Sequence, residues 1–436
     1  MQQQTLPDLD FGDPQEIDRS VSERARGLIG SEILKIASDI RKLVASGREV
    51  CNLTVGDFDS RQFPIPRPLL EGLQQALREG ETNYPPSNGV LALRESVIHY
   101  VARTWGVQYP LKSVLIASGA RPILYAAYRC VLNPGDKVVY PVPSWNNNHY
   151  TWICGAEGVA LATRPEDGFM PTPESLAPHL GEARMLCLNT PLNPTGTVIS
   201  EQSLRAVLEM ILEENERRTR DGRQHLFLLH DQVYAALVFG SARHLMPAAL
   251  VPEAAPWVIS LDGISKAFAS TGLRVGWVLA APALVRRMKS LLGHIGAWAP
   301  RAEQVALARF LNDDGAVDAF RREMDERVQL RLNALYGGFT RMKEDGYPVD
   351  CIDPQGAIYL SLRLKLVGRN LGETRLDDNE AIRRLLLDHA GLAVVPFQAF
   401  GLKEDSGWMR LSVGAVSMEE IDSCFPRLRA LLDRLD

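Results

Sequence analysis

Several features that would indicate a function are missing from this chain. It has no run of about 18 apolar residues, so we expect no membrane-spanning helix. It has only short runs of Lys and Arg and a formal net charge of -5, so nucleic acid is not an expected partner. Its six cysteines form no CxxC pair and its eight histidines are not spaced as ligands, so no metal site is expected.

What remains is the composition of an ordinary folded protein. Hydrophobic residues make up 46% and charged residues 23% of the 436 positions. This length exceeds what one core usually organises, which favours two domains or a large domain with an appendage. The opening residues, MQQQTLPDLDFGDPQEIDRS, are polar and acidic, unlike a signal peptide, so we expect a cytoplasmic location and reduced cysteines.

Short apolar runs alternate with helix-patterned stretches in the middle of the chain. Buried strands that alternate with helices predict a mostly parallel sheet with helices on both faces, an α/β fold. A helical stretch covers residues 201–216, for example. The predicted strands are residues 114–117, 137–140, 185–188, 226–229, 257–261 and 276–280.

The pattern changes near residue 315, where we place a domain boundary. A charged, helix-patterned stretch covers residues 315–343, and the runs 358–362 and 409–413 read as strands of a second sheet. The second domain is therefore expected to be smaller and of the α+β type. A helix is expected to begin at Ser31. We expect a flexible leader (residues 1–30), a segment that packs with the small domain (31–65), a large domain (66–315) and a small domain (316–436).

Polar residues that follow three of the apolar runs suggest a chemistry. Gly119, Ala120 and Arg121 open a helix, and a helix N-terminus suits a phosphate. Asp231 and Lys266 each end a run. A lysine in a closed site can form an imine with a carbonyl, and a carboxylate can keep a pyridinium nitrogen protonated. Taken singly, each is better explained as a turn or surface residue, but together they match the requirements of pyridoxal phosphate.

The chain resembles the class I and II aminotransferases of fold type I, the pyridoxal-phosphate family typified by aspartate aminotransferase. The resemblance runs in order from about residue 32 to the C-terminus. It is carried by the motifs Asn52–Asp57, Thr82–Gly89, Asn133–Asp136, Pro143–Trp145, Asn189–Gly196, Ser265–Lys266, Ser270–Trp277 and Trp408–Ser412.

The resemblance implies a role for each site residue. Lys266 would hold pyridoxal phosphate as a Schiff base and then move the proton at the substrate Cα. Asp231 would pair with the ring nitrogen, and a homodimer with shared active sites would bring Tyr84 to the neighbour's phosphate. Further cofactor contacts are implied for Gly119, Ala120, Arg121, Trp145, Asn193, Tyr234, Ser265 and Arg274, and substrate contacts for Gly56, Trp145, Asn193 and Arg410.

Three positions depart from the family's usual pattern. Gly263 stands where a serine commonly bonds the phosphate, a loss of about 1 kcal/mol for which Ser265 and Arg274 can compensate. Gln232 replaces a frequent glutamate. Gln398 stands where a glycine is usual in the loop at the substrate mouth, which can alter the choice of substrate.

Amino transfer between amino acids and 2-oxo acids is the leading hypothesis, and several others stay open. A carbon-sulfur lyase, a decarboxylase or an eliminating synthase would keep the same cofactor residues. A pyridoxal-phosphate-sensing regulator would need a DNA-binding module, for which the leader is too short, and a dehydrogenase would need an early GxGxxG motif, which is absent. A dicarboxylic substrate would require a second cation, either Arg121 or Arg301, whereas Trp298 would suit aromatic or aliphatic side chains.

Overall fold

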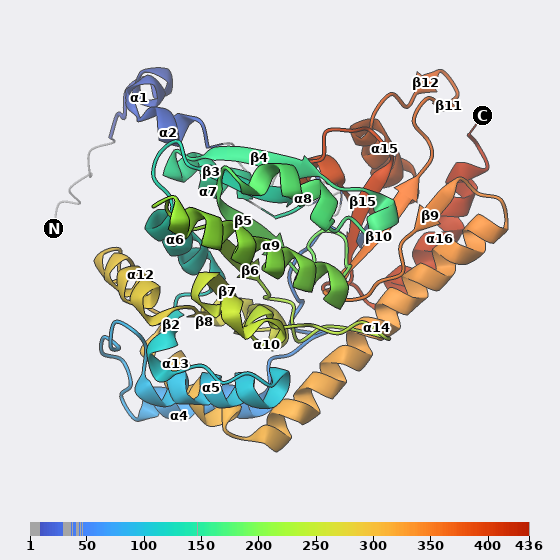
Figure 1. Cartoon of the computed structure of the whole chain (residues 1–436). Coiled ribbons are helices and arrows are strands. Elements are labelled where there is room, and N and C mark those ends of the chain that lie inside the picture. Colours follow the sequence, from blue (N-terminus) through green and yellow to red (C-terminus); the bar gives the residue numbers. More distant parts are fainter. Residues whose placement is uncertain are drawn as a thin grey trace.

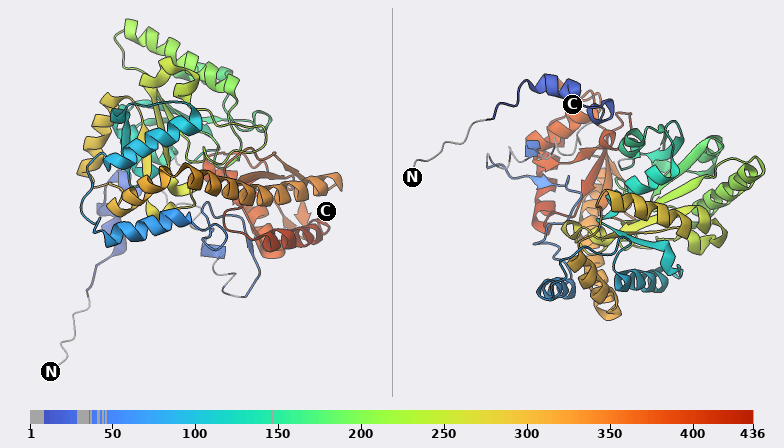
Figure 2. Two further views of the ribbon diagram at one scale, coloured as in Figure 1. Left: turned by 90° about the horizontal axis from the view of Figure 1, so that it is seen from below. Right: turned by 90° about the vertical axis from the view of Figure 1, so that its left-hand side faces the viewer.

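The structure is a computed structural model that describes residues 9–28, 36, 38–40, 43, 45, 47–145 and 147–435. Figure 1 shows a large sheet between layers of helices, with a smaller sheet and the C-terminal helices beside it. The long helix α14 (Asp314–Glu344) runs from the large part to the small part, and both views of Figure 2 show the same arrangement. The fold is α/β, as predicted.

The large sheet is mostly parallel and has the strand order β2-β8-β7-β6-β5-β3-β4. Only β8 runs antiparallel to its neighbours among these described strands. Asn189 at the end of β5 is paired in register with Asp231 at the end of β6, so polar side chains meet at one edge. The strands are β2 (Val114–Ala117), β3 (Lys137–Val142), β4 (Glu157–Ala162), β5 (Ala183–Asn189), β6 (Phe227–Asp231), β7 (Val258–Gly263) and β8 (Gly276–Leu279).

Helices cover both faces of this sheet because successive strand residues point to opposite sides. Leu115 of β2 packs with α6 (Ala120–Val131) and α12 (Pro282–His294), whereas Val114 and Ile116 pack with α5 (Leu91–Trp105) and α13 (Arg301–Leu311). The other helices around the large sheet are α4 (Arg67–Arg78), α7 (Asn147–Cys154), α8 (Pro173–Leu180), α9 (Glu201–Arg220), α10 (Pro247–Leu250) and α11 (Ile264–Ala267).

The small sheet is antiparallel, in the order β14-β15-β10-β9, and packs against α14 and α16 (Met418–Leu432). A separate parallel pair joins β1 (Cys51–Asn52) to β13 (Leu392–Ala393), and Leu53 lies in the same core. The remaining elements are β9 (Val349–Cys351), β10 (Tyr359–Leu364), β11 (Asn370–Leu371), β12 (Thr374–Arg375), α15 (Asn379–Leu385), β14 (Val395–Pro396) and β15 (Trp408–Ser412).

The six strands predicted for the large sheet and the helix predicted over residues 315–343 are confirmed, with small shifts at their ends. Strand β4 was missed, because its side chains are largely exposed at the edge of the sheet and give no apolar run. The start expected for a helix at Ser31 lies outside the described residues. No described helix combines the length and the apolar character needed to cross a membrane.

The expected leader contains two short helices, α1 (Pro14–Ser20) and α2 (Glu23–Arg26), with exposed side chains. Arg24 joins α2 to α7: its Nη1 donates to the carbonyl of Trp152 at 2.5 Å, and the Trp152 indole donates back to the carbonyl of Arg24 at 2.9 Å. This part of the leader therefore contacts the large sheet's helices, and its flexibility stays a prediction.

Candidate active site

A cavity of about 480 Å³ lies where the ends of β5, β6 and β7 meet the small sheet. It brings together most of the predicted site residues, although they come from segments far apart in the chain. Gly119, which precedes the lining residue Ala120, is not among the residues that line it, and Tyr84 lines a different cavity. The predicted residues that line it are Gly56, Ala120, Arg121, Trp145, Asn193, Asp231, Tyr234, Ser265, Lys266, Arg274 and Arg410.

Lys266 lies on the short helix α11, directly after β7, and its side chain is only 13% exposed. Its Nζ donates to the carbonyl of Gly56 at 2.6 Å and lies 3.9 Å from Oδ1 of Asp57. Burial lowers the pKa of the Lys266 amine to about 8; the nearby Asp57 opposes this shift, and the cavity's arginines add to it. The amine can therefore be neutral, and nucleophilic, near neutral pH.

Asp231 ends β6 with its carboxylate in the cavity. Burial raises its pKa to about 7, although the backbone N–H of Val233 donates to Oδ1 at 3.2 Å. A cation beside this carboxylate would favour its charged form. His230, the preceding residue, is buried on the opposite side, where its ring stacks on His244 with centroids 5.6 Å apart and burial lowers its pKa to about 4.

One end of the cavity is suited to an anion. Helix α6 begins after Gly119, and the backbone N–H groups of its first turn have no partner within the helix. The Arg274 guanidinium lies beside this turn, held by the carbonyls of Ser118 (3.2 Å) and Thr271 (2.7 Å). Gly119 has φ +83°, and a Cβ there would collide with Arg274, so a glycine is required.

The other end contains a buried guanidinium with no acidic partner in the part of the chain that the structure describes. Arg410, on β15, is 1% exposed; its Nη1 donates to Oδ1 of Asn193 (3.1 Å) and its Nη2 to the carbonyl of Thr54 (2.6 Å). Its Nε has no partner among the described residues, and burial lowers its pKa. A buried cation that lacks an anion is costly, so a carboxylate ligand would stabilise this site.

The wall between these two ends is held by a hydrogen-bonded frame. Asn189 donates from Nδ2 to the carbonyl of Asp231 (3.0 Å) and accepts the backbone N–H of Asn193 (2.8 Å). The hydroxyl groups of Tyr234 and Tyr359 lie 2.5 Å apart, and burial raises the pKa of both. These contacts fix the positions of Asp231, Asn193 and Tyr234 relative to one another.

Six lining residues were not predicted from the sequence. Asn189 and Asp57 lie inside motifs that carry the family resemblance, which was a usable signal. Tyr359 was interpreted only as a strand residue, and nothing in its neighbourhood in the sequence indicates that it meets Tyr234 or Arg410. The six residues are Asp57, Leu124, Asn189, Val233, Thr271 and Tyr359.

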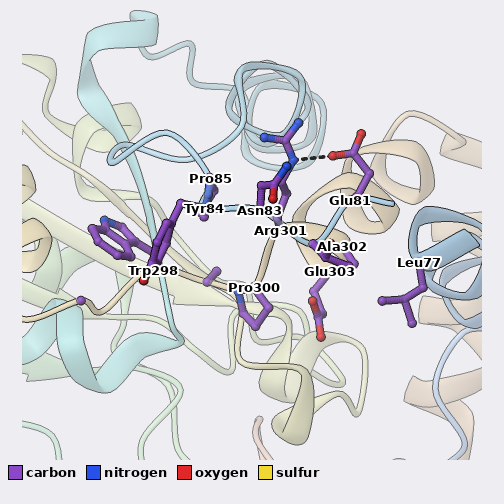
Figure 3. Close-up of a pocket in the computed structure, with 13 residues that line it drawn as sticks. Leu77, Glu81, Asn83, Tyr84, Pro85, Trp298, Pro300, Arg301, Ala302 and Glu303 are labelled. Atoms are coloured by element: carbon purple, nitrogen blue, oxygen red, sulfur yellow. Dashed lines mark hydrogen bonds and ion pairs between the residues drawn. The ribbon is translucent and has the colours of Figure 1, made fainter. Parts of the chain in front are cut away.

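Tyr84 lies on a second cavity, of about 620 Å³, which Figure 3 shows. Its side chain is 83% exposed and packs edge-on against Trp298, with ring centroids 5.2 Å apart. Arg301 begins α13 and pairs with Glu81. Arg301 and Trp298 therefore do not line the Lys266 cavity, and of the two arginines weighed as a second cation only Arg121 does.

Comparisons with known proteins agree with this geometry. The family model described as aminotransferase class I and II matches residues 48–428. The chain belongs to this family. An aspartate aminotransferase from Rhizobium meliloti (strain 1021) is 31% identical over 409 residues, 93% of this chain and 94% of that protein.

Solved structures of aspartate aminotransferases have the same fold. The enzyme from Rhizobium meliloti matches with a TM-score of 0.86 and 29% identity, over 96% of this chain and all of that one. The Thermus thermophilus enzyme with maleate matches with a TM-score of 0.84 and 25% identity, over 95% of this chain and all of that one. This chain is thus a pyridoxal-phosphate-dependent aminotransferase.

The cavity of this aminotransferase fits pyridoxal phosphate. A buried amine, an anion-binding helix N-terminus with an arginine, and a buried carboxylate all face one space of about 480 Å³. These are the groups that an aldehyde, a phosphate and a pyridinium nitrogen require.

Proposed function

We propose that this aminotransferase holds pyridoxal phosphate as a Schiff base on Lys266 and transfers the amino group of a dicarboxylic L-amino acid to a 2-oxo acid. The observation that carries the proposal is that one cavity holds both the buried Lys266 amine and the buried Arg410 guanidinium, which has no acidic partner among the residues described. The first can bond a carbonyl and the second can bind the substrate's α-carboxylate.

Each end of the cavity has a proposed task in holding the cofactor. Asp231 would pair with the ring nitrogen and Trp145 would stack on the ring, while Asn193 and Tyr234 would donate hydrogen bonds to its phenolic oxygen. The proposed phosphate contacts are Gly119, Ala120, Ser265, Arg274 and, from a second subunit, Tyr84. Arg121, for which the family resemblance also implied a cofactor contact, is proposed instead to bind the substrate.

The reaction needs residues that orient the substrate and move one proton. When bound, pyridoxal phosphate draws electrons from the substrate Cα and makes its hydrogen acidic. Arg410 and Asn193 would hold the α-carboxylate, and Gly56 would lie against the substrate. Burial lowers the pKa of the Lys266 amine to about 8. This amine would accept the proton from the substrate Cα and then donate it on the same face of the cofactor ring.

Arg121 supports a dicarboxylic substrate. Its guanidinium lies over the Trp145 ring, 5.7 Å from the centroid, and lines the cavity without an acidic partner among the described residues. It is therefore free to bind a second carboxylate. The Thermus thermophilus enzyme whose fold this chain shares was solved with maleate, which has two carboxylates.

Turnover across a panel of amino donors tests the substrate class. We expect aspartate and glutamate to be preferred over alanine and phenylalanine with 2-oxoglutarate or oxaloacetate as acceptor. Arg121→Gln should raise KM for the dicarboxylic donors on the order of tenfold, while KM for alanine stays unchanged. Arg322→Gln, at an exposed position on α14, is the control. Equal effects on both donor types would refute a second carboxylate site, and release of pyruvate and ammonia would indicate elimination.

The role of Lys266 has a direct test. Lys266→Ala should abolish the visible absorbance of the bound cofactor and nearly all turnover, because the covalent link and the proton carrier are removed together. Reduction with borohydride before digestion should mark Lys266 in the native enzyme by mass spectrometry. Retention of activity by the alanine variant, or a mark on another lysine, would contradict the assignment.

We propose a homodimer with shared active sites. The exposed Tyr84 and the cavity that it lines with Trp298 support this arrangement, because a large aromatic side chain left exposed is typical of an interface. Sedimentation should give twice the chain mass, and Tyr84→Phe should weaken phosphate retention.

We further propose that the chain divides into a large domain (66–315) and a small one (316–436), with residues 31–65 packing on the latter. The β1–β13 pair and the position of Leu53 support this division. The six cysteines form no disulfide, which suits a reducing compartment and supports the cytoplasmic location that we propose.

A further inference from the structure

A loop beside the small sheet joins Phe400 to the strand that carries Arg410. It begins with residues 397–400, of which Phe400 is buried, and ends at Gly407, directly before β15. The Phe400 ring lies 4.9 Å from the Arg410 guanidinium carbon and 6.2 Å from the Trp145 ring. Phe400 therefore touches both the carboxylate-binding arginine and the proposed ring-stacking residue.

Asn379, the first residue of α15, ties the two ends of this loop together. Its side chain is 1% exposed. Its Nδ2 donates to Oε1 of Gln398 at 2.9 Å, and its Oδ1 accepts the backbone N–H of Gly407 at 2.8 Å. One buried amide thus holds the residue two positions before Phe400 and the residue three positions before Arg410.

Gln398 holds the middle of the same loop. Its Nε2 donates to the carbonyl of Glu404 (2.8 Å) and to Oδ1 of Asp405 (2.9 Å), and this carboxylate oxygen also accepts the backbone N–H of Asn379 (2.9 Å). The two side-chain amides make four hydrogen bonds, and the backbone N–H of Asn379 adds a fifth, so that the loop is closed on itself. A connected network of this kind fixes a conformation more strongly than separate contacts do.

We propose that Asn379 and Gln398 are positioning residues that hold Phe400 against Arg410 and so set the geometry of the carboxylate site. The Arg410 guanidinium carbon lies 4.9 Å from the centroid of the Phe400 ring and 4.7 Å from that of the Tyr359 ring. Because both rings pack against the planar guanidinium, a change in its orientation requires Phe400 to move. The inference rests on the proposed role of Arg410 and adds residues that do not line the Lys266 cavity.

Kinetics of Gln398→Ala and Asn379→Ala in the pyridoxal-phosphate-loaded enzyme test this role. We expect KM for both the amino acid and the 2-oxo acid to rise about five- to tenfold, with kcat changed less than about twofold, because ground-state binding of the carboxylate is weakened. The dissociation constant of 2-methylaspartate, which has no Cα hydrogen to lose, should rise by the same factor in absorbance titrations. Cofactor retention should stay unchanged.

Four further variants make the outcome decisive. Lys403→Ala, an exposed change in the same loop, should leave KM unchanged. Phe400→Leu should raise KM, and adding Gln398→Ala to it should raise KM no further, because both act through one ring. Arg410→Lys tests the underlying site separately.

The results separate the two proposals. If Arg410→Lys leaves KM unchanged, the proposed carboxylate site is wrong. If Arg410→Lys raises KM but Gln398→Ala does not, or if the effects of Gln398→Ala and Phe400→Leu multiply, the positioning role is wrong. Gln398 is partly exposed, so its variant should fold even if Asn379→Ala does not.

Discussion

At the scale of single residues, this enzyme depends on charged groups that the fold takes out of water. Lys266 has Asp57 as its nearest carboxylate, 3.9 Å away, and Arg410 has none among the described residues. Burial disfavours the charged form of both. For Lys266 the result is a nucleophilic amine, and for Arg410, which stays charged, it is a site that gains from a carboxylate ligand.

The lowered pKa of Lys266 predicts the pH dependence of cofactor capture. Only the neutral amine attacks an aldehyde, so capture by the apoenzyme should rise with pH and level off above about 8, rather than near the 10.5 of a free lysine. Absorbance mixing experiments between about pH 6 and about pH 10 measure this. Asp57→Asn removes a charge that raises the pKa, so the midpoint should move to lower pH. A midpoint that moves upward, or stays near that of a free lysine, would contradict the assignment.

At the scale of elements, the site is carried by strands whose close approach requires glycine. A Cβ on Gly263, at the end of β7, would lie 2.8 Å from the carbonyl oxygen of Val275 and 2.9 Å from Cα of Gly276 on the neighbouring β8. Sequence comparison with the family suggested that Gly263 merely lacks a hydrogen bond. The structure adds a packing reason for the glycine: a larger residue would push β7 and β8 apart.

Gly263→Ser should therefore destabilise the enzyme instead of adding a phosphate contact. We expect a loss of about 1–3 kcal/mol in the free energy of unfolding, the usual cost of overpacking, measured by urea denaturation of the apoenzyme. Gly293→Ser is a matched control, because a Cβ at that position of α12 meets no atom within 4 Å. Unchanged stability together with tighter cofactor binding would show that the strands make room for the serine.

At the scale of the whole molecule, stability should depend on two carboxylates buried at neighbouring strands. Burial raises the pKa of Asp231 to about 7 and that of Asp262, on β7, to about 8. Both are protonated in the folded apoenzyme at pH values where the unfolded chain has already lost these protons. The stability that these two groups contribute is therefore greatest below the unfolded pKa, near 4, and is lost as the pH rises towards about 8.

Asp262→Asn should remove much of this dependence without breaking a contact. Its Oδ1 accepts the backbone N–H of Gly263 at 2.7 Å, which an asparagine oxygen can also do. The urea midpoint of the apoenzyme should be similar for the variant and the native chain at about pH 4. At about pH 8 the midpoint of the variant should be higher than that of the native chain. Glu253→Gln, an exposed change, should have no effect at either pH. An equal shift at both pH values would show that Asp262 does not ionise on unfolding.

The sequence by itself determined most of the strands, the order of the elements and most of the residues that line the Lys266 cavity. Apolar runs are read directly because burial on both faces requires them; Lys266 and Asp231 follow such runs, and Arg274 precedes one. Edge strand β4 was missed because an exposed strand needs no apolar run. The family motifs supplied Gly56, Tyr84 and Arg410, which local spacing could not connect to Lys266.

Only the tertiary structure decided how these residues meet. It joined Tyr234 to Tyr359 and Asn193 to Arg410 across long sequence separations, placed Arg121 in the cavity and left Arg301 outside it. It also showed that Gly263 packs against a neighbouring strand and that Gln398 and Asn379 brace Phe400. The physical reason is that periodicity reports whether a residue is buried, whereas its neighbours across space depend on how separate elements pack.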